Sequence, residues 1–314
     1  MEHPIFSLST KPDTRLRRYE QGDQFVEVTP SVKGLATVHD RDILIYCISQ
    51  IIGALNEGRK VDRTIRLKAH DLLTATNRMT NGQAYEGLKA ALERLRGTTI
   101  STNIKTGGTE ALDVFGLIER ARIVRETRDG RMQDIEIVLS DWVFNAIEAK
   151  EVLTLHRDYF RLRKPLERRM YELARKHCGH QSEWSIGLER LREKCGSNST
   201  LKEFRRLVKS VVEQDRTHRH MPDYAVELVE RANDVEKIVF RNRQAADRRR
   251  DAHGPPPLPG EALDAGRQIA PGWDIHVVER EWRTWCLDKD CRPHSPTQHF
   301  LTFCMSWVER RGAP

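Results

Sequence analysis

The sequence lacks the features that mark a membrane or secreted protein. No apolar run approaches the roughly 20 residues that a membrane-spanning helix needs. The longest run, residues 43–55, is interrupted by Ser49, Gln50 and Gly53. Residues 1–30 contain no apolar segment of the signal-peptide type. We therefore expect a chain of 314 residues that does not enter a membrane and acts in the cytoplasm.

Cysteine is sparse, and its spacing matches no common disulfide or zinc framework. The six cysteines include no CxxC pair, and in a cytoplasmic chain such cysteines are expected to be reduced thiols. The C-terminal region does contain several zinc-ligand types, at Cys286, Cys291, His294, His299 and Cys304. Because Cys304 also fits the apolar face of a helix, we favour packed side chains over a zinc site, and the sequence leaves this question open.

The motifs of common enzymes are also missing. The chain has no phosphate loop, GxGxxG fingerprint, GxSxG nucleophile elbow or HExxH zinc motif. Its carboxylates are scattered without an obvious catalytic pair. We therefore expect a protein that is not an enzyme and needs no cofactor or metal.

What the sequence does have is a local excess of positive charge. The net charge is +7, from 53 Lys and Arg against 46 Asp and Glu. Residues 1–150 carry 22 basic and 21 acidic groups, residues 151–250 carry 24 and 16, and residues 251–314 carry 7 and 9. The basic excess therefore lies in residues 151–250, which indicates a surface for a polyanion.

The first 150 residues have the order of elements of a winged-helix domain. Helical spacing predicts a helix over Asp40 to Asn56, with Asp40 as its cap. A strand, a short helix, a turn and a second helix are expected at 64–67, 69–74, 77–82 and 83–95. Strand patterns follow at 98–104, 112–124 and 135–139, with turns at Gly107-Gly108 and Asp129-Gly130.

Residues 151–250 repeat that order. Helices are expected at 165–177, 188–195 and 201–214, and strands at 183–186, 224–229 and 237–240, with a turn at Asn233-Asp234. A Pro-rich linker, 251–260, precedes a module at 261–314 with helices at 273–287 and 297–310. The sequence thus predicts an α+β protein with tandem winged-helix domains and a small α-helical C-terminal module.

The helix expected at 201–214 is the main candidate for binding DNA. Six apolar residues from Leu201 to Val212 share one face, and the opposite face carries basic residues. Alone, such a helix is usually just a solvated amphipathic helix. Here a short helix and a Gly-Ser turn precede it, which favours a helix-turn-helix whose second helix enters the major groove. The candidate residues are Ser197, Asn198, Ser199, Thr200, Lys202, Arg205, Arg206 and Lys209.

Other basic residues flank this helix in the expected fold. Arg163 and Lys164 precede the first helix of the second domain, and Arg241 and Arg243 follow its last strand, where we expect phosphate contacts. Arg248 to Arg250 form either a flexible arm or a solvated linker. The first domain has comparable positions with balanced charge, so DNA contact and a structural or dimer-forming role both stay open there. These auxiliary candidates are Arg78, Asn81, Gln83 and Lys89.

Several segments resemble the replication initiator protein A family of bacterial plasmids. The strongest are RKPLERRMYELARKHCG at 163–179 and WSIGLERLREKCGSNSTLKEFRRLV at 184–208. IFSLST at 5–10, GLATVHDRDILIYCISQI at 34–51 and LSDWVFNAI at 139–147 also look like that family. The resemblance covers most of residues 4–240, but not the Pro-rich linker or the tail.

This resemblance implies a fold and a function. Such initiators are tandem winged-helix proteins that bind repeated double-stranded sites in the plasmid origin, help to open it and recruit host proteins such as the replicative helicase. By this likeness the second domain reads the major groove through Ser197 to Lys209. The first domain serves as a homodimer interface or an auxiliary DNA contact, with dimers that repress and monomers that initiate.

Two other functions are compatible with the same residues. One is a sequence-specific transcriptional regulator or autorepressor that binds DNA without initiator activity. The other belongs to a different class and acts through residues 261–314, as an interaction adaptor or a metal-dependent enzyme. Plasmid maintenance distinguishes the first from an initiator, and stoichiometric zinc would support the second.

Overall fold

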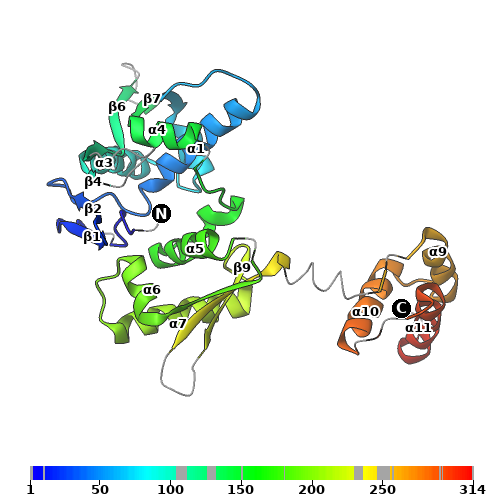
Figure 1. Ribbon diagram of the computed structural model, residues 1–314. Coiled ribbons are helices and arrows are strands. Elements are labelled where there is room, and N and C mark those ends of the chain that lie inside the picture. Colours follow the sequence, from blue (N-terminus) through cyan, green and yellow to red (C-terminus); the bar gives the residue numbers. More distant parts are fainter. Residues whose placement is uncertain are drawn as a thin grey trace. The chain divides into compact units, whose positions relative to one another are not determined.

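The chain forms two compact units, Met1–Arg241 and Asn242–Pro314. In the residues that the structure describes, the first contains helices and three sheets, and the second consists mainly of helices (Figure 1). The computed structural model describes residues 3–9, 11–103, 112–125, 132–149, 151–179, 181–229, 236–245, 255–256, 258–289, 291 and 293–312. The turns expected at Gly107-Gly108, Asp129-Gly130 and Asn233-Asp234, and the arm Arg248 to Arg250, lie outside these residues.

The first repeat consists of helices packed on a three-stranded sheet. Its elements are α1 (Arg41–Asn56), β3 (Thr64–Lys68), α2 (Ala69–Ala75), α3 (Gly82–Gly97), β6 (Ile118–Arg125), β7 (Met132–Leu139) and α4 (Asp141–Glu148). The antiparallel sheet has the order β3-β7-β6, with Ile65 opposite Ile137. These isoleucines belong to the same buried core as Leu88 and Leu92 of α3.

A second sheet in the first unit was not expected from the sequence. It has the order β1-β2-β4-β5 and consists of β1 (Arg17–Gln21), β2 (Gln24–Thr29), β4 (Thr99–Thr102) and β5 (Asp113–Gly116). The single strand pattern at 112–124 is divided at Leu117, so β5 and β6 belong to different sheets. Leu117 is buried, and the apolar residues on either side of it, Phe115 and Ile118, give no sign of such a change of sheet.

The second repeat has the same order of elements. After a short 3-10 helix, η1 (Arg157–Arg161), come α5 (Pro165–His177), β8 (Glu183–Gly187), α6 (Leu188–Cys195), α7 (Leu201–His218), β9 (Tyr224–Val229) and β10 (Lys237–Asn242). Its sheet has the order β8-β10-β9. In both repeats, therefore, the strand after the first helix pairs with the last strand of the hairpin.

Helix α5, which agrees with the helix predicted at 165–177, is buried on its polar side as well as on its apolar side. Every residue from Leu166 to Ala174 is buried. Its polar side packs against the start of α1, where the Arg168 Nη1 atom donates to Asp42 Oδ2 at 2.7 Å and Arg41 Nη1 donates to Glu172 Oε2 at 2.7 Å. The first repeat thus supplies counter-charges for the face that would otherwise be solvated.

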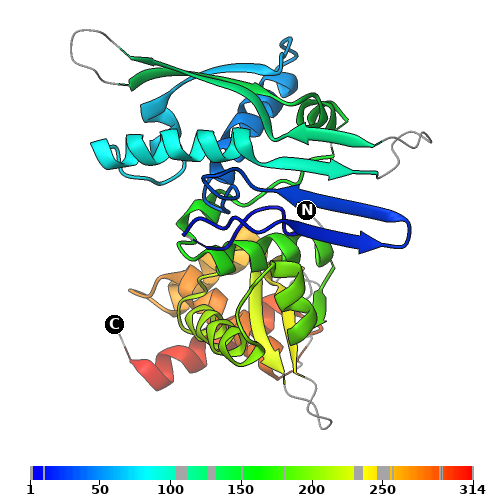
Figure 2. The ribbon, with the colours of Figure 1, turned by 90° about the vertical axis from the view of Figure 1, so that its left-hand side faces the viewer.

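The N-terminal segment lies at the junction of the two repeats. Figures 1 and 2 show the β1–β2 hairpin beside both of them. Ser7 bridges to Thr37 of the first repeat, whereas Leu8 packs against the core of the second. Residues 3–9 therefore connect elements that are far apart in the sequence.

The C-terminal unit contains three described helices, α9 (Gly260–Ile269), α10 (Ile275–Asp288) and α11 (Pro296–Arg311). Trp282, Phe300 and Cys304 are among its buried residues. The sequence predicted only the last two helices, because four of the ten residues of α9 are Gly or Ala and only Leu263 and Ile269 are large and apolar. A Cβ atom on Gly266 would lie 2.9 Å from the Phe300 ring. Among the described residues, no helix is long and apolar enough to cross a membrane.

Candidate nucleic-acid interface

Helix α7 is anchored by one apolar face and presents the other to solvent. Phe204, Val208 and Val211 are buried in the core of the second repeat. Thr200 caps the helix, since its hydroxyl accepts a hydrogen bond from the Glu203 N–H at 3.3 Å. Leu201 was expected in the core but is 40% exposed, because it lies in the first turn beyond the buried residues.

The basic residues of α7 differ in how they are held. Lys202, Arg206 and Lys209 are exposed. Arg206 forms an ion pair of 2.6 Å with Glu203 in which both side chains are open to solvent. Such a pair contributes at most about 1 kcal/mol, so an incoming phosphate can compete with Glu203. Arg205 is more restricted, because its Nε atom donates to Glu236 Oε1 at 2.6 Å just before β10.

The turn before α7 has a defined conformation. Gly196 has φ of +66° and ends α6 in the left-handed region. The Ser197 N–H donates to Arg192 O at 3.1 Å, and the Ser197 hydroxyl accepts from the Ser199 N–H at 3.4 Å. Asn198 and Thr200 are exposed, whereas Ser197 and Ser199 are half-buried. The turn thus holds short polar side chains beside the first turn of α7, whose leading N–H groups have no partners within the helix.

The predicted flanking residues do not form one surface. Lys164 lies beside α7, where its Nζ atom donates to Gln214 Oε1 at 2.7 Å. Arg163 instead donates to the carbonyl of Asn77 in the first repeat at 3.4 Å. The other two candidates, Arg241 and Arg243, lie at the C-terminal end of β10 and directly after it. Arg241 pairs with Glu183 at 2.9 Å and with Glu227 at 3.2 Å, and Arg243 is half-buried.

The four auxiliary residues of the first repeat also separate. Arg78 contacts the carbonyl of His39 and lies 3.4 Å from Asp42, so it belongs to the junction between the repeats. Asn81 caps α3 by accepting from the Ala84 N–H at 3.0 Å. Gln83 and Lys89 are exposed on α3. Of the four, only Gln83 and Lys89 have exposed side chains within a helix, as Lys202, Arg206 and Lys209 have on α7.

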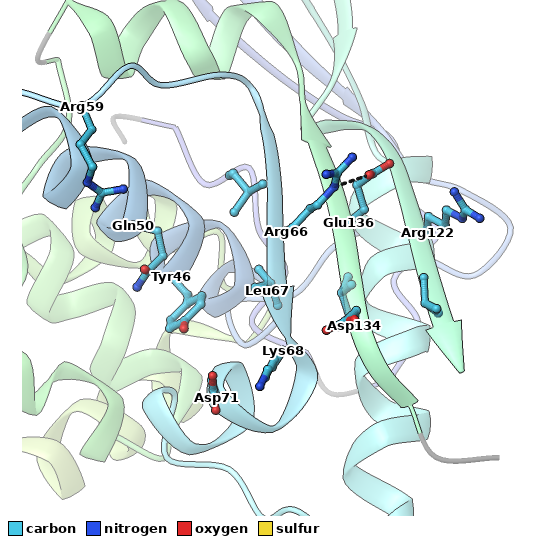
Figure 3. Close-up of a pocket in the computed structure, with 13 residues that line it drawn as sticks. Tyr46, Gln50, Arg59, Arg66, Leu67, Lys68, Asp71, Arg122, Asp134 and Glu136 are labelled. Atoms are coloured by element: carbon cyan, nitrogen blue, oxygen red, sulfur yellow. Dashed lines mark hydrogen bonds and ion pairs between the residues drawn. The ribbon is translucent and has the colours of Figure 1, made fainter. Parts of the chain in front are cut away.

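Two hollows accompany these elements. One, of about 790 Å³, lies on the first repeat between α1 and the β3-β7-β6 sheet (Figure 3). Its lining mixes cations with carboxylates, and Arg66 pairs with Glu136 at 3.0 Å. The other, of about 700 Å³, lies beside Ser197, Ser199 and Arg206 and has no carboxylate in its lining. The second is therefore the one suited to an anion.

Sequence reasoning missed the residues that connect the second repeat to the N-terminal segment. Ser9 and Arg15 line the hollow beside α7, and Pro4 lies against Gly196. The segment IFSLST at 5–10 was noticed only for its resemblance. No periodicity could have placed it there, because the contact is between residues nearly 200 positions apart.

Four of the five possible zinc ligands of the tail take part in packing, whereas His294 is exposed. The Trp282 indole N–H donates to His299 Nδ1 at 2.9 Å, and Cys291 Sγ lies 4.0 Å from His299 Nε2. Burial raises the pKa of the Cys286 and Cys304 thiols to about 11. In the part of the chain that the structure describes, no three Cys, His, Asp or Glu side chains are grouped as metal ligands.

Comparison with solved structures shows the fold. The crystal structure of RctB domains 2 and 3 aligns with a TM-score of 0.54 at 14% identity, covering 77% of this chain and 95% of that one. A selenomethionine form of the same two domains aligns with a TM-score of 0.58 at 12% identity, covering 76% and 94%. The first unit thus shares a mixed helix and sheet fold with these domains.

Comparison of sequences decides the family. The model of the replication initiator protein A family matches residues 1–226. The chain belongs to this family. A putative replication protein of Wigglesworthia glossinidia brevipalpis is 39% identical over 230 residues, which cover 72% of this chain and 82% of that protein. The family match of this initiator contains both α3 and α7 but not the C-terminal unit.

Proposed function

We propose that the chain is a plasmid replication initiator that binds repeated double-stranded DNA sites at its origin. In this proposal both repeats are winged-helix units, and α7 enters the major groove with Lys202, Arg206 and Lys209 toward the DNA. Arginine suits both the edge of guanine and phosphate, whereas lysine and the hydroxyls of the turn suit phosphate.

The observation that carries the proposal is the arrangement of α7. Its inner face is fixed in a core by Phe204 and Val208, and its outer face presents exposed cations next to the short turn that follows α6. A rigid helix with this charge distribution is what groove binding requires, because the side chains are held in register while the phosphates attract them.

DNA binding by α7 would place the protein at the origin, where the remaining steps of initiation occur. Protein bound at several of the repeated DNA sites would strain the neighbouring duplex. It would also bring host replication proteins, such as the replicative helicase, to the opened strand. The first repeat would form a homodimer or add contacts through Gln83 and Lys89. The protein acts without catalysis, in the cytoplasm.

The test is binding to the DNA that adjoins its own gene, followed by footprinting. We expect the footprint to show regularly spaced DNA sites that the bound protein protects from cleavage. Joint replacement of Lys202, Arg206 and Lys209 by Ala should reduce the slope of log affinity against log salt by up to about 0.9 per lost phosphate contact. Unchanged affinity and slope would show that α7 does not face the DNA.

A matched control lies on the same helix. Arg216 pairs with Glu213 at 2.8 Å in the same i,i+3 geometry as Arg206 with Glu203, but ten residues further along. Arg216→Ala should leave affinity and salt slope unchanged. Plasmid maintenance then separates an initiator from a regulator, because a regulator that only represses transcription would not support replication of an origin plasmid.

A further inference from the structure

The hollow beside α7 is formed by three separate parts of the chain. Leu8, Ser9 and Arg15 come from the N-terminal segment, Lys164 precedes α5, and the α6–α7 turn and α7 complete it. The lining contains three cations, Arg15, Lys164 and Arg206, and no carboxylate. It also contains four serines, which can donate hydrogen bonds, at positions 9, 197, 199 and 210.

The N-terminal segment is held firmly against the turn. The Arg17 Nη1 atom donates to the carbonyl of Pro4 at 3.2 Å, as does the Tyr19 hydroxyl at 3.2 Å. Pro4 in turn lies so close to Gly196 that a Cβ atom there would be 2.7 Å from the proline ring. The segment is therefore part of the wall of the hollow.

Arg15 is oriented by a buried carboxylate. Its Nε and Nη2 atoms donate to the two Asp13 oxygens at 3.0 and 3.1 Å. Asp13 also pairs with Arg17 at 2.7 Å, so one carboxylate serves two guanidinium groups and positive charge remains. The Arg15 side chain is 62% exposed although its polar end is held in place.

The other two cations are accessible as well. The side chains of Lys164 and Arg206 are 47% and 68% exposed. The carboxylate partner of Lys164, Glu167, is 1% exposed and so is not in a position to repel a ligand at the surface. Three cations with hydroxyls and no acidic lining are the donor set expected around phosphate oxygens.

We propose that this cleft binds the sugar-phosphate backbone of the DNA next to the bases that α7 reads, with Arg15 and Ser9 as part of the contact. The inference rests on the proposed function, because α7 must approach DNA for its neighbour to do so. Leu8, Leu207 and Val211 also line the cleft and suit the apolar face of a deoxyribose. The DNA-binding surface of the second repeat is then completed by residues from the start of the chain.

The test compares Arg15→Ala with Arg18→Ala in the full-length protein. Arg18 lies three residues away on β1, where it pairs with Glu20 at 2.7 Å, and it does not line the cleft. The probes are the duplex that adjoins the gene and a duplex of mixed sequence. We expect Arg15→Ala to weaken binding to both roughly threefold to tenfold and to reduce the salt slope by about 0.9, with no effect of Arg18→Ala.

Two further variants separate phosphate binding from other causes. Arg15→Lys keeps the charge and should retain most of the salt slope, which a loss of fold would not allow. If the α7 variants reduce the slope but Arg15→Ala, still folded by its denaturant unfolding curve, does not, the cleft does not bind DNA. If neither set of variants alters binding, the proposed function itself is wrong.

Discussion

At the scale of single residues, Gly196 is where the start of the chain meets the second repeat. Its backbone is in the left-handed region, and the Pro4 ring occupies the space where a side chain would begin. Both facts exclude larger residues, the first through backbone strain and the second through overlap. The glycine therefore shapes the turn before α7 and admits the N-terminal segment to it.

We expect Gly196→Ala to lower the free energy of unfolding by roughly 1–3 kcal/mol, since the left-handed conformation and the overlap with Pro4 both oppose a Cβ atom. Urea unfolding measures this. Gly187→Ala is the control, because Gly187 has φ of −62° and no heavy atom lies within 4 Å of the position that its Cβ atom would take. Equal effects of the two substitutions would contradict the close contact.

Charged residues at the surface and in the interior cannot be separated from sequence alone. Asp40 was predicted to cap α1, but its carboxylate accepts from the Thr37 N–H and pairs with Arg94 of α3 at 2.7 Å. No side-chain cap is formed at α1. The N-cap pattern is a local signal, whereas the competing guanidinium comes from a distant helix.

At the scale of elements, local patterns were sufficient where the contacts are local. The bounds of α6 at Leu188 and Cys195 agree with the prediction, since apolar spacing and Gly196 define both the helix and its end. Helix α7 was predicted to end at Gln214 but extends to His218. The additional turn contains Asp215, whose buried carboxylate is explained only by its partners in the following segment.

The β1–β2 hairpin and the buried face of α5 could not be predicted for a related reason. Strand β1 and the polar side of α5 are rich in charged residues, and although β2 alternates Val26 and Val28 with polar residues, its partner is distant in the sequence. Strand β2 pairs with β4, and α5 meets the start of α1. The sequence does indicate which residues of α7 carry charge, but not that Arg205 is bound to Glu236 or that Arg15 lies nearby. The composition of the candidate site was thus predictable within one element and not between elements.

Asp215 provides a prediction at this scale. Its two carboxylate oxygens accept from the Met221 N–H at 2.8 Å and the Val226 N–H at 3.0 Å, which joins the end of α7 to β9. Asp215→Ala leaves these two buried N–H groups without that acceptor, and we expect a loss of about 2–5 kcal/mol in unfolding free energy.

The control for Asp215 is Glu213→Ala on the same helix, whose side chain is 60% exposed and should matter by less than about 1 kcal/mol. Denaturant unfolding of both variants compares them directly. A small effect of Asp215→Ala would mean that the end of α7 and the hairpin are joined mainly by apolar packing.

At the scale of the whole molecule, a buried ionic network joins the two repeats. Arg41 and Asp42 at the start of α1 meet Arg168 and Glu172 of α5, and the Tyr159 hydroxyl donates to Glu172 Oε1 at 2.7 Å. The segments GLATVHDRDILIYCISQI and RKPLERRMYELARKHCG, which carry much of the resemblance to the family, are therefore in contact. They determine how the repeats are joined, and Arg168 and Arg169 do not contribute to the basic surface.

We expect Arg168→Ala to lower the free energy of unfolding by about 3–5 kcal/mol, because it leaves the buried Asp42 carboxylate with only a longer contact to Arg78. Arg120→Ala, which removes an exposed partner of Glu136, should cost less than about 1 kcal/mol. Denaturant unfolding distinguishes the two, and similar small losses would show that the junction does not need its charges.

The separate core of the C-terminal unit has a consequence for the history of the gene. Its described core residues, from Ile275 to Trp307, have no member in common with the cores of the two repeats, and the family match ends at residue 226. Recombination that exchanges the coding segment for this unit would replace none of the described core residues beneath α7. If the proposed function holds, this end of the protein can therefore diversify between related genes while the DNA site that α7 recognises stays the same.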